Sequence, residues 1–235
     1  MLAGSSLILG GLIALRVPIS KLALGMIMAF GSGVLVSAVA YELVLKAYTT
    51  AAGSGGVALG LLTGAGTFFA GDIMIDRFGG DDRKRSSLVQ AGAPALAIVL
   101  GIVLDGIPES IVLGTSLLGG GGVAVAVVAA VFISNVPEAI AATTGPTAGG
   151  WSAQRVIWLW VIVALVSALA AVAGHAFPDG ASPRNIAFVD AFAGGVILTM
   201  LADTMMPEAL EHGGKLVGLA TTFGFLTAFA LTTLE

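Results

Sequence analysis

The stretch Ala95–Leu118 reads ALAIVLGIVLDGIPESIVLGTSLL, and its only charged residues are Asp105 and Glu109. A transmembrane helix needs roughly 20 predominantly apolar residues, which this stretch provides. An ionised carboxylate near the centre of such a helix is costly unless it is protonated, bound to a cation or placed in a water-filled cavity. The stretch therefore predicts a membrane-spanning helix that carries a polar function.

The composition of the whole chain is that of a membrane protein. Of its 235 residues, 57% are hydrophobic and 10% are charged, and the mean hydropathy is +1.03. The 34 glycines suit close packing of helices in a bilayer. The absence of cysteine excludes disulfides, iron–sulfur clusters and thiolate metal sites, so a bound metal must use oxygen or imidazole ligands. The net charge of −4 is small and scattered, which does not favour a nucleic-acid partner.

Polar and turn residues divide the chain into eight apolar segments. The sequence therefore predicts an all-α, polytopic membrane protein of eight transmembrane helices, in a single domain covering residues 1–235. The predicted spans are Leu2–Leu15, Ser20–Tyr48, Gly56–Asp76, Leu88–Leu118, Val123–Thr143, Trp151–His175, Ile186–Leu210 and Lys215–Thr233.

The distribution of lysine and arginine predicts the orientation of these spans. Basic loops stay on the cytoplasmic side, and an outside N-terminus places eight of the ten basic residues inside. An even number of spans then places both termini outside the cytoplasm. We expect a multi-pass protein of the cell membrane, plasma or inner. The basic residues predicted to lie inside are Arg16, Lys21, Arg77, Arg83, Lys84, Arg85, Arg155 and Lys215.

Two internal similarities predict a repeated architecture. Ile107-Pro108-Glu109 matches Val136-Pro137-Glu138 at an offset of 29 residues, and Phe30–Leu35 matches Phe192–Ile197 at an offset of 162. The latter pair lies in the second and seventh spans, which are five apart, so the repeats must be inverted in the membrane. We expect a 3+2+3 arrangement, with repeat 1 at about 1–87, a central pair at about 88–145 and repeat 2 at about 146–235.

The central pair of spans carries the residues that suit a metal site. Asp105 and Glu109 are four residues apart on one helical face, as are Ser134 and Glu138, with Asn135 beside them. A divalent cation would compensate several carboxylates at once. Each motif also contains a proline, which leaves a backbone carbonyl one turn earlier without its helical donor. A single Pro-Glu motif is also consistent with a packing role, but its repetition on two spans favours function.

The paired Pro-Glu motifs, within eight spans and beside matching second and seventh spans, resemble the Zrt-/Irt-like (ZIP) family of metal transporters. The fourth and fifth spans of that family carry His-Asn-x-Pro-Glu-Gly and a related x-x-x-Pro-Glu-Gly. The resemblance covers essentially the whole chain. It implies transport of zinc, iron, manganese or similar ions toward the cytoplasm by alternating access through a binuclear-type site, without ATP hydrolysis and with no prosthetic group.

Residue by residue, the resemblance also shows departures from the family. Asp105 falls on the family's histidine, Gly106 on its asparagine and Ser110 on its glycine, while the sixth span offers only Ser167 in place of a carboxylate. A site of oxygen ligands alone favours harder ions than zinc, such as manganese or iron(II). The predicted metal ligands are Asp105, Glu109, Ser134, Asn135 and Glu138.

Three further carboxylates are candidates for the transport pathway. Asp203 resembles the acidic position of the family's seventh span, and Asp76 resembles the cytoplasmic end of the third span. Glu42, near the outer end of the second span, is a candidate gate for incoming metal. For Glu42 and Asp76 the simpler reading is an interfacial carboxylate that faces water or a basic neighbour.

Two functions remain open at this stage. The first is a divalent-metal carrier whose partners are the metal ions and the lipid bilayer, and a homodimer is possible. The second is a membrane protein that binds metal as a sensor or structural element without transport. An enzyme is not expected, because the chain has no G-x-S-x-G, H-E-x-x-H or P-loop motif.

Overall fold

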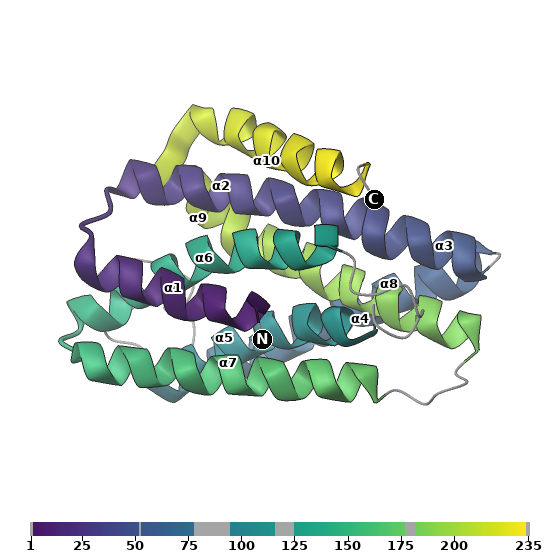
Figure 1. The fold of residues 1–235 in the computed structure, drawn as a ribbon, viewed down its shortest axis with the longest axis horizontal. Helices are drawn as coiled ribbons and strands as arrows, with labels where there is room; N and C mark the ends of the chain where they lie inside the picture. Colours follow the sequence, from purple (N-terminus) through teal and green to yellow (C-terminus); the bar gives the residue numbers. More distant parts are fainter. Residues whose placement is uncertain (1, 52, 78–94, 116–124, 177–181, 234–235) are drawn as a thin grey trace.

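A computed structural model describes residues 2–51, 53–77, 95–115, 125–176 and 182–233, and all the regular secondary structure in these ranges is helical (Figure 1). The α-helices are α1 (Leu2–Arg16), α2 (Lys21–Ala38), α3 (Lys46–Ala51), α4 (Ser54–Ile75), α5 (Ala95–Thr115), α6 (Val125–Ala148), α7 (Ala153–His175), α8 (Pro183–Met200), α9 (Met206–Gly213) and α10 (Val217–Thr232). Two π-helices, η1 (Val39–Leu45) and η6 (Leu201–Met205), continue α2 and α8, and a 3-10 turn, η7 (Gly214–Leu216), precedes α10.

Within the described ranges, four helical stretches are long and apolar enough to cross a membrane: Lys21–Ala51, Gly55–Ile75, Ala153–His175 and Pro183–Thr232. The last contains α8, α9 and α10, and the chain turns within it at Gly214, whose φ is 57°. The protein is therefore an all-α protein with several helices suited to a membrane, as the sequence predicts.

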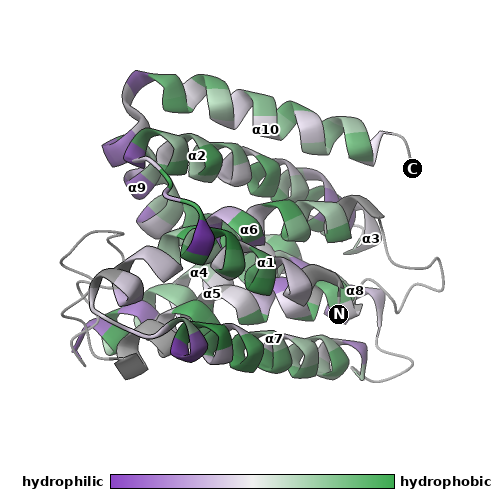
Figure 2. Cartoon of the chain, turned by 60° about the vertical axis from the view of Figure 1, so that its left-hand side comes forward, coloured by the Kyte–Doolittle hydropathy of each residue, from purple (hydrophilic) through white to green (hydrophobic). Residues whose placement is uncertain are grey.

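The outer surface of the helices is apolar as well. Leu62 and Leu219 are each 72% exposed, and Leu169 is 69% exposed. Figure 2 shows hydrophobic residues along the lengths of the helices, with hydrophilic ones gathered at α9 and near helix ends. A soluble monomer rarely exposes so much apolar surface. A helix surrounded by lipid, in contrast, presents apolar side chains to the hydrocarbon.

Glycines allow the helices to pack in close pairs. A Cβ atom added to Gly33 of α2 would overlap the carbonyl oxygen of Thr221 in α10, and one added to Gly64 of α4 would overlap that of Phe192 in α8. The pair α5 and α7 is equally close at Gly114, while α1 packs against α6 at Gly10. The helix backbones therefore approach each other closely, which glycine and other small residues allow in membrane proteins.

Helices α2 and α8 have the same type of N-cap, the same length and the same continuation into a π-helix. Ser20 and Ser182 cap them, each accepting a hydrogen bond from the backbone N–H three residues later, at 3.2 and 3.3 Å. Both helices have 18 residues, and each runs directly into a π-helix, η1 or η6. The caps and the π-helix starts are related by the offset of 162 residues that also relates Phe30 to Phe192.

Trp160 joins α1, α6 and α7 within a buried apolar cluster that includes Leu7 and Ala139. Its side chain is 1% exposed, its Nε1–H donates to Thr143 Oγ1 at 2.9 Å, and its indole lies where a Cβ on Gly11 would be. We expect Trp160→Phe to lower the free energy of unfolding by on the order of 2 kcal/mol, from the lost hydrogen bond and the cavity left behind. Thermal unfolding in detergent measures this. Trp158→Phe, at a side chain that is 59% exposed, should change stability by less than about 0.5 kcal/mol.

Candidate metal site in the central helices

The two Pro-Glu motifs lie inside α5 and α6, with Pro108 and Pro137 within the helices. Proline has no N–H, so the carbonyl four residues earlier loses its usual donor. Hydroxyl groups near each proline donate within their own helix: Ser110 Oγ to the carbonyl of Gly106 at 2.8 Å, and Ser134 Oγ to that of Val131 at 3.1 Å. These bonds do not reach the carbonyls of Leu104 and Ile133 that the prolines leave without a donor, yet both helices are continuous through the motifs.

Glu109 lies on the wall of a small cavity that also includes Glu42. Its side chain is 1% exposed, and the cavity, of about 20 Å³, is otherwise apolar, with residues such as Leu35 and Ile197. Glu42 comes from the π-helix η1 and is half-buried. The sequence places Glu42 on a possible pathway, and the structure brings it to the same cavity as the central glutamate of α5.

Glu138 lies on a second cavity of about 20 Å³, which has a more polar wall. Asn135, 6% exposed, lines it from the same helix, and Ser110 and Ser167 line it from α5 and α7. A volume of this size holds about one water-sized particle. Amide, hydroxyl and carboxylate oxygens are ligands that hard divalent cations accept. This cavity therefore suits a single small cation or water molecule.

Val131 contributes to the walls of both cavities, so the two glutamates lie near the same side chain but on different cavities. Of the predicted ligands, the structure brings Asn135 together with Glu138. Ser134 is fully buried and lines neither cavity. The side chain of Asp105 lies outside the described part of the structure.

The other predicted pathway residues lie away from these cavities. Asp203 is exposed within η6, and Asp76 is half-buried at the end of α4. Across the described parts of the chain, no three His, Asp or Glu residues are placed to share one metal ion. The two glutamates thus line different cavities. Glu109 shares its cavity with Glu42, whereas Glu138 shares its cavity with neutral amide and hydroxyl groups.

Three further polar residues, Ser110, Ser167 and Asp190, are buried or line a cavity in this region and are not among the predicted ligands. Ser110 and Ser167 were noted for their departure from the family pattern, and both line the cavity of Glu138. Asp190, 6% exposed, is buried within α8. Asp190 is the only charged residue between Ile186 and Leu201, and a charged residue within such an apolar stretch is usually functional.

A comparison with known protein-family models finds no match to this sequence, and a comparison with curated proteins finds none either.

Proposed function

We propose that the protein carries divalent metal cations across a membrane through the acidic cavities of α5 and α6. The observation that carries this proposal is the burial of Glu109, 1% exposed beside a proline in an apolar helix, together with the repetition of its motif at Glu138 in α6. A carboxylate with so little solvent needs a proton or a cation, and a divalent cation also compensates the nearby Glu42.

The chemistry of the ligands supports a preference for harder ions. The described cavity walls supply carboxylate, amide and hydroxyl oxygens and no imidazole. We expect manganese and iron(II) to be favoured over zinc relative to sites that contain histidine. Movement toward the cytoplasm by alternating access is what the resemblance to the ZIP family implies, and it forms part of the proposal.

We further propose eight spans in a 3+2+3 inverted repeat. Gly33 and Gly195 are 162 residues apart, and each approaches a backbone carbonyl of a partner helix, α10 or α4. Gly64 and Gly224 are 160 apart and approach the carbonyls of Phe192 and Phe30 in the same reciprocal way. Figure 1 shows α2 and α8 running in opposite directions along the bundle. These correspondences support an inverted repeat.

The topology predicts opposite locations for the two serine caps. The chain has no cysteine, so Ser20→Cys and Ser182→Cys each provide a single thiol, and both positions are exposed. In intact cells, a membrane-impermeant maleimide should label Ser182→Cys and leave Ser20→Cys unlabelled until the membrane is permeabilised. Labelling of both positions from the same side would contradict the inverted arrangement.

Uptake by the purified protein in liposomes tests the proposed transport. Wild-type protein should admit Mn²⁺ and Fe²⁺ into liposomes faster than protein-free liposomes do, without ATP. Equilibrium binding of the same ions, measured in detergent, separates the two functions that the sequence leaves open. Saturable binding together with uptake indicates a carrier, whereas saturable binding with uptake at the protein-free rate would overturn transport and favour a sensor. Asp105→His should shift the ranking of ions toward zinc.

A further inference from the structure

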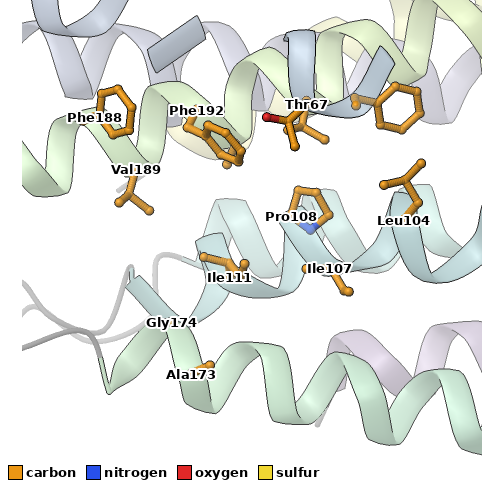
Figure 3. A pocket seen from close by; sticks show the side chains of 13 residues that line it. Thr67, Leu104, Ile107, Pro108, Ile111, Ala173, Gly174, Phe188, Val189 and Phe192 are labelled. Atoms are coloured by element: carbon orange, nitrogen blue, oxygen red, sulfur yellow. The ribbon is translucent and has the colours of Figure 1, made fainter. Parts of the chain in front are cut away.

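A cavity of about 490 Å³ lies between two close helix pairs, α4 with α8 and α5 with α7 (Figure 3). Its volume falls within the roughly 300–1,000 Å³ of small-molecule sites and exceeds the roughly 150 Å³ of an apolar cavity that holds benzene. It is separate from the two small cavities of Glu109 and Glu138. The proposed metal pathway does not account for it.

The wall of this cavity is apolar. Thr67 is the only polar residue among those that line it, and its hydroxyl donates to the carbonyl of Thr63 in the same helix at 2.7 Å. Aromatic and aliphatic side chains such as Phe192 and Leu104 cover the rest (Figure 3). A water molecule would lack the two to four polar partners it normally has inside a protein, and a metal ion would lack ligands.

The cavity opens onto an apolar outer surface. Thr67 and Ala173, on opposite helix pairs, are both exposed. Their neighbours in the chain face outward as well: Phe69 is 61% exposed and Val172 is 65% exposed. In a membrane protein, a surface of this kind contacts the hydrocarbon of the bilayer. The material available to enter the cavity is therefore lipid.

The cavity also extends from one end of the bundle toward its middle. Ala173 lies two residues before the end of α7, and Phe188 lies five residues after the start of α8. From Phe188 to Val196 the lining covers about 12 Å of helix. A lipid whose headgroup stays at the interface, near these helix ends, has a hydrocarbon chain directed along this path.

We infer that this cavity binds one hydrocarbon chain of a membrane lipid. The chain would pack against α5 at Leu104 and Pro108, the turn in which the proline removes a backbone hydrogen bond and which is followed at once by Glu109. Bound lipid would thus support the helix that carries the buried glutamate. The inference requires only that the protein lies in a bilayer, and it stands whether or not metal transport is shown.

Photo-labelling from within the bilayer tests this inference. The protein is reconstituted with a small fraction of phosphatidylcholine that carries a diazirine midway along one acyl chain, irradiated and mapped by peptide mass spectrometry. We expect label on Phe192, which lines the cavity and is half-buried, so that its ring is accessible to a hydrocarbon chain in the cavity (Figure 3). Ala173→Trp, at the rim, should abolish this label, and Val189→Trp should do the same from α8.

Val172→Trp provides the matched control, because it introduces the same side chain one residue away on the outer surface of α7. It should leave the label on Phe192 unchanged. Unchanged elution from size-exclusion chromatography for all three variants shows that the loss of label is not a loss of folding. The inference is overturned if Phe192 of the wild type carries no more label than the fully buried Val34, or if the rim variants keep the label. Oxidation of Phe192 by hydroxyl radicals would overturn it in favour of water.

Discussion

Replacing Glu109 with glutamine is expected to reduce divalent-metal uptake by at least about 100-fold, since loss of an outer-shell partner alone often costs 10–100-fold. Glutamine has the same shape as glutamate, so the packing around this 1% exposed side chain is retained while its charge is lost. Glu138→Gln should have a comparable effect, because it removes the only carboxylate from the second cavity among its lining residues. The initial rate of radioactive manganese uptake into liposomes measures both effects.

Glu211→Gln is the matched control for these variants. It makes the same chemical change at an exposed position on α9, and we expect wild-type uptake from it. In metal-free buffer, Glu109→Gln should unfold at a temperature close to that of the wild type, because the substitution conserves the volume of the side chain. Uptake by Glu109→Gln at the wild-type rate, with Glu211→Gln equally active, would remove this glutamate from the pathway.

Replacing Gly64 with leucine is expected to prevent accumulation of folded protein. A Cβ at this position would overlap the carbonyl oxygen of Phe192, and backbone atoms cannot move aside as side chains can. The loss of stability should therefore exceed the roughly 1–3 kcal/mol typical of overpacked side chains. The yield of monodisperse protein in detergent and its midpoint of thermal unfolding report the change.

Gly66→Leu gives the corresponding control two residues away in α4. A Cβ on Gly66 meets no atom within 4 Å, and the position is exposed. It should yield folded protein at nearly the wild-type level. Equal yields for Gly64→Leu and Gly66→Leu would mean that α4 and α8 are not in backbone contact at Gly64.

Much of the fold is predictable because its determinants are local in the sequence. Long apolar runs predict membrane helices from the cost of burying backbone and charge in lipid, and α1, α4 and α7 begin and end within about three residues of the predicted spans. The matching motifs of the second and seventh spans also predict that α2 and α8 are alike. Residues 88–94 and 116–118 of the predicted fourth span lie outside the described residues.

The π-helices and the partners of each carboxylate could not be predicted in this way. The periodicity of apolar residues locates a helix, but it does not show that part of the helix is a π-helix. The π-helix η1 shifts Glu42 within its span, and no residue pattern indicates that shift. Asn135 and Glu138 share a cavity because they are close on one helix, which the sequence predicts. Glu109 and Glu42 line one cavity because of how the helices pack in three dimensions, which no local pattern of a single sequence shows.

The most direct test of the central claim is to locate a bound metal ion in crystals grown with manganese, using anomalous scattering. The proposed site predicts an anomalous peak within coordination distance of the carboxylate of Glu109 or Glu138, inside the bundle formed around α5 and α6. The peak should vanish for Glu109→Gln combined with Glu138→Gln. Peaks confined to the outer surface, with no density beside either glutamate at saturating manganese, would contradict it.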